Sequence, residues 1–228
     1  MNIYLLPIFA VLFGSLVIFF WQPKDLRSIK LLLAFSGAFL LGTTLISLLP
    51  SVFTNGNEHI SYWILAWIII QIVLEQLSKG AEHGHIHISE KRVPMTLVTG
   101  LYLHAFIEGF PIHKHNDLLW AIVIHKLPIA MLLTLAIWQT NFNFSKKVII
   151  LVGFAIMTPM GSYLNIYTAI LQPYSVHITA LVVGVLLHIS TTILFESTEH
   201  HKFNISKLLA IVIGIGLSIL KHWHLFEI

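Results

Sequence analysis

The sequence predicts an all-α, polytopic membrane protein with eight transmembrane helices, and two observations lead to this fold class. The first is composition: 57% of the 228 residues are hydrophobic and 10% are charged, whereas soluble domains carry about 25% charged residues. The second is the length of the apolar runs, which lie near the roughly 20 residues that a helix needs to cross a bilayer. Because these runs do not alternate with polar residues, they favour helices over the strands of a membrane barrel.

Eight apolar segments account for most of the chain, and we interpret residues 1–228 as a single transmembrane domain. The first segment lacks the basic region and the small-residue cleavage site of a signal peptide, so we expect it to be retained as a span. Glycines within the later segments allow helices to approach one another closely. The expected spans cover residues 2–21, 31–53, 61–77, 94–112, 118–138, 147–170, 175–196 and 205–222.

The basic residues predict the orientation of the chain, because cytoplasmic loops carry an excess of Lys and Arg. Two residues, Lys114 and Lys221, lie in the opposite set of loops and the tail, and Lys126 lies within a span. Alternate loops carry the others, which are Lys24, Arg27, Lys30, Lys79, Lys91, Arg92, Lys146, Lys147, Lys202 and Lys207. This asymmetry predicts that both termini lie outside.

Three side chains that commonly bind metals lie inside the fourth and fifth spans. His104 and Glu108 are four residues apart and therefore share one face of a helix. His125 follows in the next span, after a short polar link that forces an antiparallel pair. Counting from this link, His104 and His125 lie at about the same depth, roughly 12–14 Å at 1.5 Å per residue. Since ionisable groups at such depth are costly and usually functional, the three residues predict a metal site.

Other polar residues allow two interpretations each. His188 in the seventh span lies deeper than His104 and is either a later stop on an ion pathway or a packing hydrogen bond. Glu75 closes the third span, and of its two interpretations we favour a solvated helix end over a metal ligand. His113, His115 and Asp117 form either an outer entrance for cations or an interfacial turn.

A His-rich cytoplasmic loop is expected at residues 78–93. Its loop histidines, His83, His85 and His87, alternate with single residues and lie near Glu82. This pattern suits weak metal capture, although a solvated loop that is rich in histidine is the alternative. Fourteen histidines without a cysteine favour imidazole ligands over thiolates.

The paired motifs resemble those of the ZIP family of divalent metal transporters. The fourth helix of that family carries His-x-x-x-Asp/Glu-Gly, which stands here as His104, Glu108 and Gly109, and the fifth carries His-x-x-Pro, which stands here as His125 and Pro128. The resemblance covers the whole chain and extends to 48–50 (Leu-Leu-Pro) and 158–161 (Thr-Pro-Met-Gly). It implies eight helices with both ends outside and a single transport domain.

This sequence departs from many members of that family, which have Asn or Ser after the first His and acidic residues that complete a two-metal centre. Ala105, Lys126 and Ile129 occupy these places, which is closest to a minor branch that shares the Ala and the Lys. Because an ammonium repels a second cation, we expect one ion, bound by His104, Glu108, His125 and water. We further expect Lys126 to pair with Glu108 when no ion is bound.

The function predicted from these residues is secondary or facilitated transport of divalent metal ions into the cytoplasm. Zn²⁺ is the expected ion, and Fe²⁺ and Mn²⁺ are the alternatives. A membrane-embedded zinc hydrolase and a metal sensor are the competing functions. The hydrolase needs an acid/base group beside a metal-bound water, and no further carboxylate lies at the depth of the site. We expect no prosthetic group, no nucleic-acid partner and a multi-pass location in the plasma (inner) membrane, with a homodimer as one possible assembly.

Overall fold

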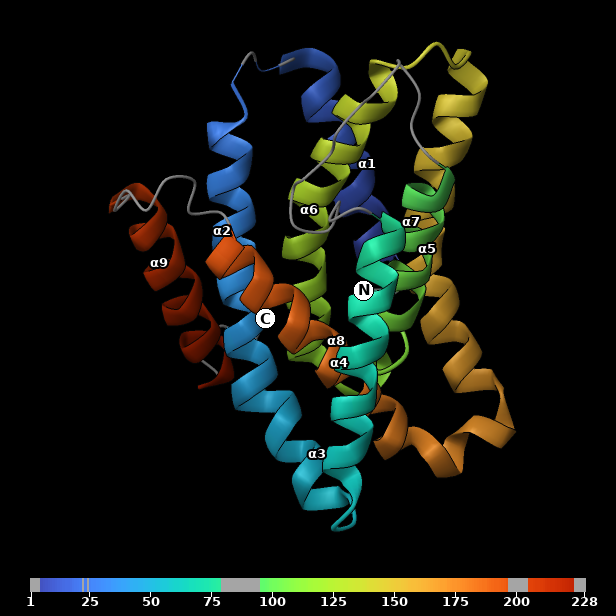
Figure 1. Cartoon of the computed structure of the whole chain (residues 1–228), viewed down its shortest axis with the longest axis vertical. Coiled ribbons are helices and arrows are strands. Elements are labelled where there is room, and N and C mark those ends of the chain that lie inside the picture. The colour runs from blue at the N-terminus through green and yellow to red at the C-terminus, as the bar shows by residue number, and fades with distance from the viewer. Residues whose placement is uncertain (1–4, 22, 24, 79–94, 197–204, 224–228) are drawn as a thin grey trace.

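The computed structural model describes residues 5–21, 23, 25–78, 95–196 and 205–223. These residues form long apolar helices that run roughly along the long axis of the molecule (Figure 1). The prediction of an all-α fold is confirmed. The loop histidines and nearly all of the expected His-rich loop lie outside the described residues.

Eight long helical segments are present in the described parts of the chain. The second is continuous but has three parts, an α-helix, a π-helical turn at Thr44–Leu48 and another α-helix. The segments are α1 (Leu5–Trp21), α2 (Arg27–Thr43) with α3 (Leu49–Asn55), α4 (Ile60–Ser78), α5 (Met95–Glu108), α6 (Asn116–Trp138), α7 (Phe144–Tyr167), α8 (Ser175–Glu196) and α9 (Ile205–His222).

Five of these segments are long and apolar enough to cross a membrane, and the remaining three, α1, α4 and α5, are shorter apolar helices. The chain is therefore an integral multi-pass membrane protein. That all eight segments cross the membrane, with both termini outside, stays a prediction.

The fourth helix is shorter than expected. The apolar run predicted a span over residues 94–112, but α5 ends at Glu108 and is followed by a turn and a 3₁₀ segment at Ile112–Lys114. Glycine is a poor helix former and proline disfavours helical geometry in the residue before it. Gly109 and Pro111 therefore end the helix, although the sequence there remains apolar. As a result, Glu108 lies at the very end of α5.

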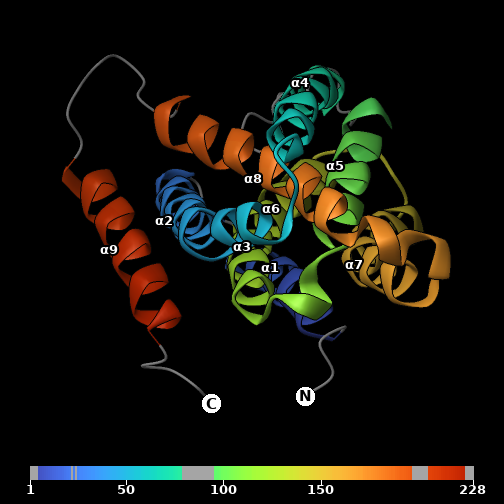
Figure 2. The ribbon, with the colours of Figure 1, turned by 90° about the horizontal axis from the view of Figure 1, so that it is seen from below.

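The helices pack in two groups of four. In the first group, α1 packs on α6 and α7, and α5 packs on α7; in the second, α2 packs on α8 and α9, and α4 packs on α8. Contacts of α2 with α6 and of α4 with α5 join the groups, and Figure 2 shows α9 at the edge of the molecule beside α2.

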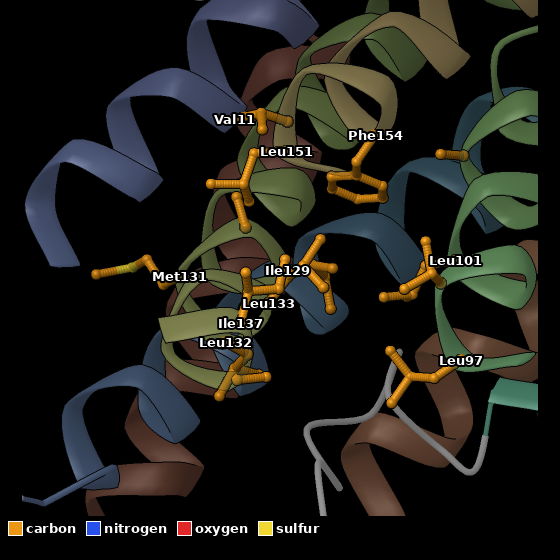
Figure 3. Packing of buried hydrophobic residues seen from close by; sticks show 14 of the residues in the cluster. Val11, Leu97, Leu101, Ile129, Met131, Leu132, Leu133, Ile137, Leu151 and Phe154 are labelled. Atoms are coloured by element: carbon orange, nitrogen blue, oxygen red, sulfur yellow. The ribbon is translucent and has the colours of Figure 1, made fainter. Parts of the chain in front are cut away.

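A large hydrophobic cluster fills the interior of the first group. Val11 of α1, Leu101 of α5, Ile129 of α6 and Phe154 of α7 are each at most 3% exposed and point toward one another (Figure 3). Close packing of this kind holds α5, α6 and α7 in fixed positions. These are the helices that carry the buried polar residues described next.

Candidate metal centre

The four central polar residues of the two motifs meet inside the first group of helices. His104 and Glu108 come from α5, and His125 and Lys126 come from α6. Their side chains are nearly inaccessible, with exposures of 3% for His104, 2% for Glu108, 1% for His125 and 2% for Lys126. Polar groups buried to this degree need partners within the protein, and Glu108 provides the centre of the arrangement.

The Glu108 carboxylate is contacted from three helices. Lys126 Nζ of α6 donates to Oε1 at 2.5 Å. Thr158 Oγ1 of α7 lies 2.9 Å from the same oxygen and 2.9 Å from the Ala105 carbonyl, so its single proton serves one of them at a time. His104 Nε2 lies 3.3 Å from Oε2. The expected pairing of Lys126 with Glu108 is confirmed.

Lys126 also lies against an aromatic ring. Its ammonium is 4.6 Å from the centre of the Phe154 ring, a distance at which the ring attracts a cation. The lysine is therefore held inside the helix group by a carboxylate and by an aromatic face, and it does not reach outward to the membrane surface.

Two glycines bring Thr158 to the carboxylate. A Cβ at Gly109 would lie 2.1 Å from the Thr158 carbonyl oxygen, and a Cβ at Gly161 would lie 2.0 Å from the Phe106 carbonyl oxygen. Neither distance is compatible with a side chain, so these glycines permit α5 and α7 to touch backbone to backbone. Gly109, which directly follows Glu108 in the motif, is thus needed for the packing of α7 on the site.

The two histidines approach each other but do not yet share an ion position. Their ring centres are 6.3 Å apart and the ring planes are nearly perpendicular, at 85°. Two imidazoles on one tetrahedral zinc, with bonds of 2.0–2.1 Å, would have ring centres about 5 Å apart. Consistent with this difference, no three His, Asp or Glu side chains in the described residues lie close enough to hold an ion.

His104 and Glu108 already have the spacing of two ligands of one ion. Bonds of about 2.0–2.1 Å at a tetrahedral angle place two ligand atoms roughly 3.3 Å apart, and His104 Nε2 lies 3.3 Å from Glu108 Oε2. Binding of one ion by all three residues would therefore require the His125 ring to approach His104 by about 1 Å.

The structure places His188 away from this centre. His188 Nε2 lies 2.6 Å from Glu75 Oε2, between α8 and α4. The interpretation of Glu75 as a solvated helix end was wrong, because its side chain is 19% exposed and contacts His188. Near the start of α6, the Asp117 carboxylate lies 3.9 Å from Lys221 Nζ and 3.7 Å from His222 Nδ1 of α9.

Two residues of the centre were not identified from the sequence. Thr158 belongs to the Thr-Pro-Met-Gly motif at 158–161, but no sequence pattern predicted its contact with Glu108. No feature of the sequence indicated a role for Phe154, because aromatic residues are common in apolar spans. Both depend on the packing of α7 against α5 and α6.

Comparison with known families supports the motif assignment. The family model described as the ZIP zinc transporter matches residues 71–220, which include both motifs. None of the curated proteins matches the chain.

Proposed function

The chain belongs to the ZIP zinc transporter family. We therefore propose that it transports divalent cations into the cytoplasm, with Zn²⁺ as the main substrate, and that His104, Glu108 and His125 bind the ion on its way. The observation that supports this proposal is the meeting of two imidazoles and one carboxylate on adjacent, buried helices. Nitrogen and oxygen ligands of these types suit Zn²⁺ and its neighbours, including Fe²⁺ and Mn²⁺. Family membership removes the hydrolase alternative, since the family is one of transporters.

Lys126 supplies the charge that Glu108 needs when no cation is bound. An isolated carboxylate inside a membrane is costly, and the ammonium at 2.5 Å neutralises it. An arriving cation takes over this task and displaces the ammonium from the carboxylate, while Phe154 offers the lysine a second contact at 4.6 Å. Each binding event thus replaces the Lys126 ammonium at Glu108 with the metal ion.

The incomplete set of protein ligands around the ion favours transport of the ion over tight, permanent binding. Three protein ligands leave at least one position of a tetrahedral ion for water. The competition from Lys126 further limits the affinity, and a transported ion must bind weakly enough to leave again. Lys126 also favours a centre with a single ion, because it occupies the space beside Glu108 that a second ion would need.

The expected orientation of the chain in the membrane follows from the distribution of its basic residues. Ten of the thirteen Lys and Arg residues lie in alternate loops or in the helix ends beside them, which favours a cytoplasmic position for these loops. We infer that eight crossings return the chain to the outside, in a plasma (inner) membrane, and that the whole chain is one transport domain. The loop histidines would then collect or sense ions on the cytoplasmic side.

Flux through purified protein tests the function directly. Vesicles that contain the protein are given radioactive Zn²⁺, Fe²⁺ or Mn²⁺, and uptake is compared with that of empty vesicles. We expect saturable uptake of Zn²⁺ that is abolished in His125→Ala and retained in His177→Ala, which changes a histidine of α8. Equal uptake by the two variants would contradict the proposed site.

A further inference from the structure

A second cluster of polar side chains lies in the other group of helices, between α4 and α8. Figures 1 and 2 both show these two helices side by side. The contact between His188 Nε2 and Glu75 Oε2, at 2.6 Å, joins them. Both side chains are largely buried, with exposures of 16% and 19%. A carboxylate and an imidazole thus face each other outside the centre on α5, α6 and α7.

Gln71 is the unusual member of this cluster. It is 0% exposed, and neither atom of its amide has a hydrogen-bond partner among the residues that the structure describes. An amide that is buried without a hydrogen-bond partner destabilises the folded protein, because it has lost its hydrogen bonds to water. Glutamine in an apolar helix therefore needs a reason that packing does not supply.

Two contacts between α4 and α8 lie on either side of Gln71 along α4. A Cβ at Gly184 of α8 would be 2.4 Å from the Ile64 carbonyl oxygen and 3.3 Å from the Ile68 nitrogen of α4. His188 meets Glu75 about one turn further along α8 and about two turns beyond Ile68 along α4. Gln71 lies between these two contact points and one turn before Glu75, so the two residues share the face of α4 that packs on α8.

We propose that Gln71, Glu75 and His188 form a second binding site for a divalent cation of the Zn²⁺ type. The amide oxygen, the carboxylate and the imidazole are neutral or anionic ligands that such ions accept. The ion would give the Gln71 amide oxygen the partner it lacks. This site does not depend on ion binding by His104, Glu108 and His125.

The geometry indicates the change that binding requires. His188 and Glu75 are in direct contact at 2.6 Å, whereas two ligand atoms on one tetrahedral ion lie roughly 3.3 Å apart. An entering ion therefore separates the pair by less than about 1 Å. Three protein ligands leave a position for water, and the single carboxylate makes the site weakly binding and suited to rapid exchange.

Calorimetric titration of purified full-length protein with Zn²⁺ tests this proposal. The background variant lacks the first centre, through His104→Ala and His125→Ala, and has alanine in place of the loop histidines. We expect it to keep one saturable site. Glu75→Gln and His188→Ala should each weaken that site by at least about tenfold, and Gln71→Leu should weaken it by a smaller factor.

Matched controls identify the source of any remaining binding. Gln76→Leu changes an exposed amide on the same helix, and His177→Ala removes another histidine of α8; neither should alter the affinity. If His188→Ala fails to fold, His188→Gln keeps a polar side chain of similar size and serves in its place. A background variant without saturable binding, or equal affinity in Glu75→Gln and in the controls, would overturn the proposal. Loss of uptake in His125→Ala tests the other centre and leaves this result unaffected.

Discussion

Replacement of Lys126 by methionine separates the role of the ammonium from that of the ion. Methionine keeps the length and apolar volume of the side chain but removes the positive charge beside Glu108. In the metal-free protein, the carboxylate then remains 2% exposed, and Thr158 and His104 are its remaining polar contacts among the described residues. In the metal-bound protein, the ion neutralises the carboxylate, so the same substitution should matter less.

The expected size of the effect follows from the burial of the pair. Removing one partner of a buried ion pair costs about 3–5 kcal/mol, and the carboxylate can recover part of this by taking up a proton. For a chain of this length, we therefore expect the melting temperature of the metal-free protein to fall on the order of 10 °C. Saturating Zn²⁺ should restore most of the loss, because a ligand that binds only the folded state stabilises it.

Thermal unfolding in detergent, with and without Zn²⁺, measures both quantities. Lys207→Met is the matched control, because Lys207 is also buried, at 8% exposure, but donates to the Leu194 carbonyl far from both motifs in the sequence. Its destabilisation should be the same with and without Zn²⁺. If Lys126→Met is destabilised equally in the two conditions, the exchange of ammonium for metal ion at Glu108 is refuted.

Three further predictions concern the same pathway. His104→Ala and His125→Ala should each abolish uptake of Zn²⁺ by vesicles while the protein remains folded and inserted; uptake by both at the wild-type rate would remove them from the pathway. Alanine at all three loop histidines should change the rate or regulation of uptake without stopping it, and complete loss of flux in a stable variant would make the loop obligatory. Gly109→Ala should destabilise the protein by about 1–3 kcal/mol and impair uptake, because the new methyl group would overlap the Thr158 carbonyl. Gly216→Ala, where a Cβ has nothing within 4 Å, should be neutral in the same unfolding and uptake measurements.

Four residues of the first centre, the two histidines, Glu108 and Lys126, could be predicted because local rules were sufficient to place them. A spacing of four residues put His104 and Glu108 on one face, and the short link put His125 at the same depth. The cost of a lone carboxylate in the membrane then led to Lys126 as its partner. None of these steps needed knowledge of how distant helices pack.

Other features depended on contacts that no local rule provides. Thr158 reaches Glu108 because two glycines let α7 touch the end of α5, and nothing in the sequence pairs these helices. Glu75 was misread because its place near a helix end predicted solvent, whereas α8 covers it with His188. Gln71 did leave a signal, an amide within an apolar run and one turn before Glu75, but only the packed structure shows that it is fully buried.

The two polar clusters differ in how their charge is balanced, and this difference bears on how an ion would move. At Glu108 a lysine contacts the carboxylate at 2.5 Å, so an ion that binds there would have to displace the ammonium from the carboxylate. At Glu75 one of the partners is a histidine, and neutral imidazole is itself a metal ligand. In the proposed scheme, the first centre therefore exchanges the ammonium of Lys126 for a metal ion, whereas the second binds a metal ion together with His188. Since the first lies on α5–α7 and the second on α4 and α8, binding at one can be measured while the other is disabled.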